Sequence, residues 1–284
     1  MSTARSRVSQ RIAFGVLGAA TALTVLPIIV ILAYIAWKGG PALSPGFLLD
    51  APRGGMREGG IWPALVGTLY LTLGTGIIAV PLGLAAAVYL SEYARETAFT
   101  RSIRIAIVNL AGIPSVVYGL FGLAMFVLFM RLGTSIVAAC LTLSIMTLPV
   151  IISTAEEALR AVPQSFRVVS VSLGGTKWQT IRRIVLPQAL PGILTGVILG
   201  LERAAGETAP ILFTAAAFFL PRLPDSPFDA TMALPYHLFV IATQVPGMPL
   251  QIQYGTALVL LVFVLSMNVI ATVIRSRARA RRQW

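Results

Sequence analysis

Long apolar stretches alternate with short polar segments along the whole chain. A helix needs about 20 mostly apolar residues to cross the hydrocarbon core of a bilayer, and each stretch is close to that length. We therefore predict an all-α, polytopic membrane protein with about six transmembrane helices. The predicted spans are residues 12–37, 62–90, 105–130, 134–152, 188–213 and 255–274.

The spans divide the chain into three parts. Residues 1–61 comprise a basic tail, the first span and a loop rich in glycine and proline; residues 62–274 form the transmembrane core; residues 275–284 form a second basic tail. The longest external segment, 214–254, contains six prolines. Within it we expect residues 232–243 to form a short helix at the surface.

The composition agrees with a membrane protein. Hydrophobic residues make up 57% of the chain and charged residues 11%, compared with roughly 25% charged residues in soluble domains. The net charge of +12 is compatible with nucleic-acid binding. However, the basic residues cluster beside the apolar spans, as the positive-inside rule describes. We therefore expect no nucleic-acid partner.

The same rule predicts the orientation. With the N-terminus inside, the cytoplasmic segments hold sixteen lysines and arginines and the external segments hold five. The inverted topology would reverse this ratio. Six spans then place both termini in the cytoplasm.

The loop between the fourth and fifth spans, residues 153–187, is a long polar insertion on the cytoplasmic side. Its first part predicts a short helix, in which Phe166, Val169 and Leu173 share one face. Gly174 is expected to end this helix, because glycine adopts left-handed backbone angles without strain.

A second helix is predicted directly afterwards. Thr176, followed three residues later by Gln179, is the sequence signature of a capping box. The loop would thus present a short amphipathic helix in water, supported by a second helix that runs into the membrane. A membrane protein could offer such a helix to a soluble partner.

The fifth span carries three charged residues, Glu202, Arg203 and Glu207. Counted from Gln188, they lie past the middle of the membrane and toward its outer side. Arg203 and Glu207 are four residues apart and can pair on one face. Charges at this depth are costly unless they face water or a partner. Two interpretations remain open: a salt bridge that holds helices together, or the lining of a polar translocation path.

Small residues also recur in this span at every fourth position. Such a stripe allows another helix to pack closely. Its members are Gly192, Gly196, Gly200, Ala204 and Thr208.

We recognise no catalytic or metal-binding motif. Residues 174–178 lack the spacing of a phosphate-binding loop, and His237 and Cys140 are the only residues of their types. We therefore predict a non-catalytic chain without a cofactor or metal site. Any nucleotide hydrolysis would be carried out by a partner protein.

The cytoplasmic loop resembles the EAA loop of ABC-transporter permeases. In that pattern Glu-Ala-Ala is followed by three residues, Gly, nine residues and Ile-x-Leu-Pro. Here Gly174 is followed by nine residues and then by residues 184–187, Ile-Val-Leu-Pro. The first half departs from the pattern, because Val168, Val169 and Ser170 stand where Glu-Ala-Ala is usual.

Two further runs resemble the phosphate-specific (Pst) permeases. They are residues 113–123, IPSVVYGLFGL, and residues 202–210, ERAAGETAP. The second run, followed by Ile-Leu-Phe-Thr, is more similar to the PstA branch than to the PstC branch. The resemblance covers roughly residues 62–274.

This resemblance implies a type I (MetI-like) importer fold and a permease subunit of an ATP-driven phosphate importer in a bacterial inner membrane. The implied partners are a PstC-like second permease, a PstB-like ATPase dimer and an external PstS-like phosphate-binding protein, in a lipid bilayer. The implied translocation-path residues are Glu202, Arg203 and Glu207, with Arg203 as the positive charge near the path. The implied ATPase-coupling residues are Phe166, Arg167, Val168, Val169, Ser170, Leu173 and Gly174.

Other functions stay open at this stage. A permease of the same fold for sulfate, molybdate or an amino acid would carry the same loop. A self-sufficient channel or secondary transporter is a second alternative, although we find no internal repeat of the kind that many secondary transporters contain. Whether the second permease is a distinct chain or another copy of this one also stays open.

Overall fold

The computed structural model describes residues 2–280 and is almost entirely helical. The described residues contain five helices long and apolar enough to cross a membrane, or up to six if one bent pair counts as a span. The five long helices are α1 (Ser2–Gly39), α3 (Trp62–Val88), α6 (Ile136–Arg160), α9 (Leu186–Gly206) and α12 (Leu250–Ala280). The predicted all-α polytopic class is therefore confirmed.

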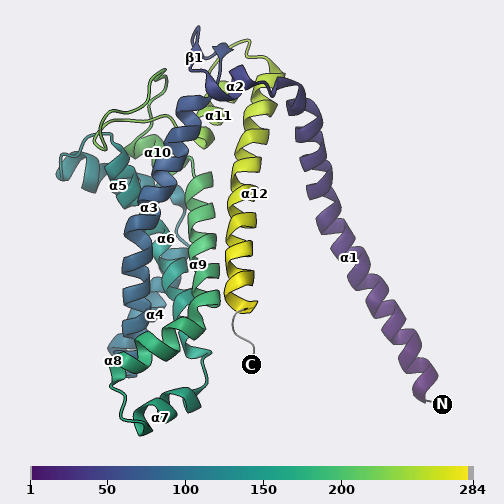
Figure 1. Ribbon diagram of the computed structural model, residues 1–284. Coiled ribbons are helices and arrows are strands. Elements are labelled where there is room, and N and C mark those ends of the chain that lie inside the picture. Colours follow the sequence, from purple (N-terminus) through teal and green to yellow (C-terminus); the bar gives the residue numbers. More distant parts are fainter. Residues whose placement is uncertain (1, 281–284) are drawn as a thin grey trace.

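Helices α3, α6 and α9 form the centre of the bundle, and α12 packs against α9 (Figure 1). The predicted stripe of small residues meets α6 through its three glycines, whereas its last member, Thr208, lies beyond the end of α9. A Cβ atom at Gly196 would collide with the side chain of Thr154, and one at Gly192 would lie 2.6 Å from the Ala158 Cβ. Glycine at these positions allows close contact between the two backbones.

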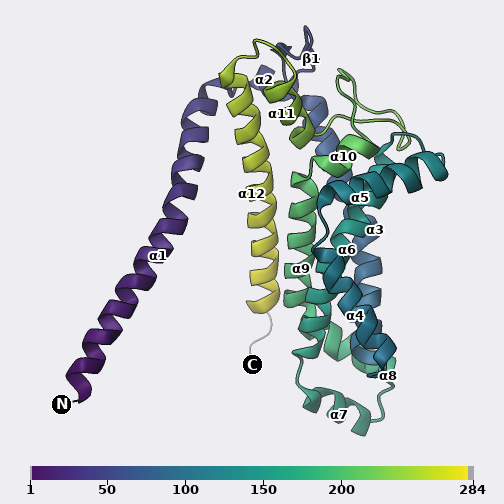
Figure 2. The same ribbon diagram turned by 180° about the vertical axis from the view of Figure 1, so that it is seen from behind.

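Helix α1 diverges from the bundle along most of its length (Figures 1 and 2). It meets α12 near its C-terminal end, where the rings of Tyr34 and Tyr254 make an edge-to-face contact at 5.6 Å. No residue in the most apolar 18-residue window of α1 is buried. The start of α1 and the end of α12 point to the same side of the bundle as α7 (Gln164–Ser172) and α8 (Lys177–Thr180).

The expected span at 105–130 is not one continuous helix. The structure has α4 (Ala98–Ala111) and then α5 (Ser115–Gly122), which continues as the π-helix η3 (Leu123–Phe129), and the two parts are bent by 101°. The break lies at Pro114, whose ψ of 139° is extended. Proline lacks a backbone N–H and disfavours helical angles in the residue before it, so the helix stops there.

Other span boundaries also differ from the prediction, and the sixth span, expected at 255–274, is the longer helix α12 (Leu250–Ala280). The second helix continues past residue 90 as the π-helix η2 (Tyr89–Tyr93), and the fourth continues to Arg160. The fifth ends at Gly206 instead of residue 213, because Glu207 has an extended ψ of 138°. A separate short helix, α10 (Ala209–Thr214), follows.

The opposite end of the bundle carries the predicted loops. Here lie the 3-10 turn η1 (Gly40–Ala42), α2 (Pro45–Leu49), α11 (Leu234–Thr243) and a two-stranded hairpin, β1 (Pro52–Arg53) and β2 (Glu58–Gly59). The strands pair antiparallel, with Pro52 opposite Gly59 and Arg53 opposite Glu58.

The expected short helix at 232–243 forms as α11, but it is not a surface helix. Its residues Leu234, Tyr236, His237, Val240 and Ile241 are buried. Most of them belong to an apolar cluster that also contains residues of α2 and α3. Helix α11 therefore forms part of the core under the loops.

Candidate coupling segment and charged cluster

The polar loop between α6 and α9 folds as the two predicted helices. Helix α7 ends before Gly174, which has a φ of +81°. Helix α8 starts with the predicted capping box: the Gln179 N–H donates to Thr176 Oγ1 at 3.2 Å, and the Thr176 N–H donates to Gln179 Oε1 at 2.9 Å. The chain then continues through the π-helix η4 (Ile181–Val185) into α9. Local signals alone therefore predict this hairpin of helices.

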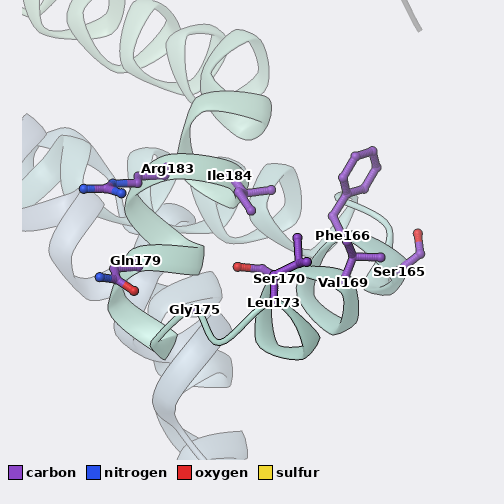
Figure 3. Close-up of a pocket in the computed structure, with 9 residues that line it drawn as sticks. All are labelled: Ser165, Phe166, Val169, Ser170, Leu173, Gly175, Gln179, Arg183 and Ile184. Carbon is purple, nitrogen blue, oxygen red and sulfur yellow. The ribbon is translucent and has the colours of Figure 1, made fainter.

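An exposed apolar surface covers much of α7. Val168 and Val169 are exposed, and Leu173 has 83% of its surface accessible. Beside them, a groove of about 400 Å³ lies between α7 and η4. Figure 3 shows Phe166, Val169 and Leu173 on one side of this groove and Ile184 on the other. A contiguous exposed apolar patch of this kind is typical of an interaction site.

Ser170, however, does not belong to the exposed surface. It is buried, and its hydroxyl group shares a 2.7 Å hydrogen bond with the Thr180 hydroxyl. Ser170 therefore links α7 to α8 at the inner wall of the groove.

Arg167 also points back into the protein. Its Nη2 donates to Glu92 Oε1 at 2.6 Å, and its Nε donates to Glu92 Oε2 at 3.3 Å. Further donations reach the carbonyl oxygens of Val162 at 2.7 Å and Leu159 at 2.9 Å. The expectation that Arg167 is part of the docking surface is not supported by its position, because its guanidinium group is occupied by these four contacts.

No motif in the sequence pointed to the residues that receive these contacts. Glu92 lies at the end of the second span, and no local pattern links it to Arg167. Its neighbour Tyr93 lies under Lys177 of α8, whose Nζ is 4.7 Å from the ring centroid. The signal available in the sequence was only the presence of an acidic residue close to the end of an apolar span.

A second group of charges joins α4 to α6. Arg104 Nε donates to Glu156 Oε1 at 2.8 Å, its Nη1 to Glu96 at 2.8 Å and its Nη2 to the Leu90 carbonyl oxygen at 2.9 Å. Arg160 lies 2.9 Å from the same Glu156 oxygen. The hydrogen bond from Arg104 lowers the pKa of the Glu96 carboxyl. This network holds α4 against the end of α6.

The charged residues of the fifth span are divided between two places. Arg203 and Glu207 pair as predicted, with 3.4 Å between Nε and Oε1, at the point where α9 ends. Glu202 lies beside Asn268 of α12, and its buried Oε1 atom lacks a hydrogen-bond partner among the described residues. The three residues therefore do not form one cluster. The pair at the α9 terminus is half-buried.

Within residues 2–280, we find no group of three or more His, Cys, Asp or Glu side chains that could hold a metal ion. The two sites that remain are the exposed surface on α7 and the Arg203–Glu207 pair. The described residues thus form a polytopic helical membrane protein with an exposed apolar helix at one end and a half-buried ion pair nearer the other.

Comparisons with known proteins identify the family. Residues 79–280 match the family described as "Binding-protein-dependent transport system inner membrane component", and the chain belongs to this family. It is 34% identical over 291 residues to the phosphate transport system permease protein PstA 1 of Mycobacterium tuberculosis (99% of this chain, 92% of the relative). It is 32% identical to a probable PstA of Methanocaldococcus jannaschii (92% of each).

The fold is also found among solved transporters. An inward-facing structure of the MetNI methionine ABC transporter aligns with a TM-score of 0.61 at 18% identity, over 76% of this chain and 94% of that chain. The chain thus has the MetI-like fold of type I importers. Permeases of this family are transport components and not catalysts, and they work with an ATPase and a substrate-binding protein.

Proposed function

We propose that this chain is the transmembrane permease subunit of an ATP-driven, binding-protein-dependent importer of inorganic phosphate. The observation that carries the proposal is its similarity to PstA proteins over almost its whole length, in a bacterium and an archaeon. A match that extends over the spans and the loops is stronger support than the short cytoplasmic motif, which permeases for other substrates share.

The exposed face of α7 supports docking to the ATPase. Val168, Val169 and Leu173 would be covered by a groove on that partner, together with the apolar groove beside Phe166. Removing this apolar area from water would contribute roughly 25 cal/mol per Å². The coupling surface would thus consist of Phe166, Val168, Val169 and Leu173. Gly174 would end α7 and allow the chain to turn into α8.

The partners that we propose are a PstC-like second permease, a PstB-like ATPase dimer and a PstS-like phosphate-binding protein. The unburied surface of α1 supports a second membrane subunit, since α1 diverges from its own bundle. This chain would form half of the translocation path.

The proposed orientation places α7, α8 and both termini in the cytoplasm. The basic residues support it, because Arg167, Lys177, Arg182 and Arg183 lie at the α7–α8 end. The loops around α2, β1 and α11 would then face the binding protein on the outer side.

Arg203 would provide positive charge near the outer part of the path, and Glu207 would hold its guanidinium group in place at 3.4 Å. Phosphate carries negative charge, so a cation inside the membrane region favours its passage. Glu202 and Glu207 could accept hydrogen bonds from protonated phosphate oxygens.

The test is uptake of radiolabelled phosphate into proteoliposomes that contain this chain with its cognate ATPase, second permease and binding protein. We expect uptake only with all components and ATP, and no uptake of radiolabelled sulfate in parallel vesicles. Uptake of sulfate in place of phosphate would retain the importer but refute the substrate. Uptake by this chain alone without ATP would refute the importer.

A further inference from the structure

The π-helix η2, at the end of α3, receives basic side chains from separate parts of the chain. From α4, Arg104 donates to the Leu90 carbonyl oxygen at 2.9 Å. From α7, Arg167 binds Glu92 through two nitrogens, at 2.6 and 3.3 Å. Two parallel bonds between a guanidinium group and a carboxylate fix orientation as well as distance.

A third contact comes from α8, where Lys177 lies over the ring of Tyr93 at 4.7 Å. η2 is thus the place where the end of α3 meets both helices of the coupling segment. Its backbone is a single turn with an i to i+5 hydrogen bond, from the Ala94 N–H to the Tyr89 carbonyl oxygen at 2.8 Å. Such π-helical turns are rare and occur frequently at functional sites.

The space around these contacts is not filled by side chains. A cavity of about 550 Å³ lies between η2, the end of α6, α7 and α8, and Glu92, Arg167 and Lys177 line it. The Arg167–Glu92 pair is therefore a polar contact at the edge of a cavity, and it lies beside an apolar cluster that contains Leu90 of η2, against which Phe166 of α7 packs.

The Arg167–Glu92 pair is nevertheless shielded from water. The side chains of Arg167 and Glu92 are only 18% and 8% exposed. Breaking a shielded charge pair by removing one partner leaves the other charge uncompensated, which is costly. Arg167 also binds the carbonyl oxygens of Leu159 and Val162, where α6 ends and α7 begins. A displacement of α7 must then move η2 with it.

We propose that Glu92 and Arg167 form the contact that transmits the movement of α7 to α3, and that they act as positioning residues for coupling between ATP hydrolysis and transport. This inference rests on the proposed function, because it assumes that an ATPase moves α7. In this role the two residues act through each other, and not through contact with the substrate or the ATPase. Their role is to convert movement of the docking helix into movement of the bundle.

The experiment measures phosphate imported per ATP hydrolysed in proteoliposomes of the complete transporter. Glu92→Gln keeps the size of the side chain and removes the charge, and leaves the bonds from Arg167 to the backbone carbonyls available. We expect the ratio to fall by at least about threefold, while the ATPase still co-purifies with the permease. Asp225→Asn is the matched control, because it breaks the 2.7 Å Arg222–Asp225 ion pair in an exposed loop at the other end of the molecule. It should leave the ratio unchanged.

A double-mutant cycle gives the second measurement. If the two residues act as one contact, Arg167→Gln combined with Glu92→Gln should lower the ratio no further than the more severe single variant does. Glu92→Asp, which keeps the carboxylate, should restore part of the ratio. A Glu92→Gln transporter with the wild-type ratio, or effects of the two variants that add, would overturn the proposal.

The two proposals fail in different ways. If the wild-type complex imports no phosphate, the proposed function fails. If it imports phosphate with ATP and Glu92→Gln does not change the ratio of phosphate imported to ATP hydrolysed, only the coupling role of the Arg167–Glu92 pair fails. Because the ratio refers to assembled, ATP-hydrolysing complex, a lower yield of a variant does not mask the result.

Discussion

Arg167 Nη2 and Glu92 Oε1 lie 2.6 Å apart, although the two residues are separated by 75 positions in the chain. Arg167 belongs to the helix that we expect to dock on the ATPase, and Glu92 belongs to the end of a membrane helix. The side chains of α7 therefore have two different roles. Its apolar side chains face outward, whereas its arginine holds the helix to the bundle.

The apolar face of α7 should be required for binding the ATPase. Leu173→Asp places a charge at the most exposed apolar position of this segment, where it would be buried in the complex without a partner. We expect the ATPase no longer to co-purify with the permease, while the melting temperature of the isolated permease stays unchanged. Phe228→Asp, a similar change at an exposed residue of the opposite loops, is the control. Retention of the ATPase by the Leu173 variant would contradict this docking surface.

Arg203 should be required for transport but not for assembly. Arg203→Gln removes the positive charge of the Arg203–Glu207 pair, and we expect phosphate uptake to be abolished in a complex that still contains all its subunits. Arg222→Gln, at an exposed arginine in the external loop, should transport normally. Normal uptake by the Arg203 variant would mean that the charge has a structural role or none.

The contact between α9 and α6 should tolerate no added methyl group at Gly196. Gly196→Ala would force its Cβ against Thr154, and overpacking of this kind typically costs about 1–3 kcal/mol. Gly206→Ala adds the same group where no atom lies within 4 Å. Thermal unfolding of the purified permease should therefore show a lower melting temperature for Gly196→Ala and little change for Gly206→Ala. Equal melting temperatures would contradict the close packing.

His237 should make the stability of the protein depend on pH. It lies in α11, outside the membrane-spanning helices, and burial lowers its pKa from 6.5 to about 4. The unfolded chain therefore binds a proton at a higher pH than the folded chain does, so the free energy of unfolding falls as the pH decreases from about 6.5 to about 4.

His237→Leu should remove this part of the pH dependence. His237 is the only histidine in the chain, so no other imidazole contributes to the comparison. Melting temperatures of the two proteins, measured between pH 7.5 and pH 4.5, would show the difference. A decrease of the same size in both would mean that His237 does not titrate as its burial requires.

Much of the architecture follows from the sequence alone, because its signals are local. An apolar stretch of sufficient length must satisfy its backbone hydrogen bonds internally within a membrane, so helices follow directly. Gly174, Thr176 and Gln179 determine the turn and the second helix of the loop between α6 and α9 through contacts a few residues apart. The pairing of Arg203 with Glu207 is likewise a matter of four-residue spacing.

The tertiary structure decided the features that depend on distant partners. Whether Pro114 would kink a span or break it depended on how α4 and α5 pack against the bundle, and the result is a bend of 101°. The direction of Arg167 depended on Glu92, and the burial of α11 depended on its contacts with α2 and α3. In each of these cases the free energy comes from groups far apart in the chain. Hydropathy and spacing show which residues can make such contacts, but only the folded chain brings the partners together.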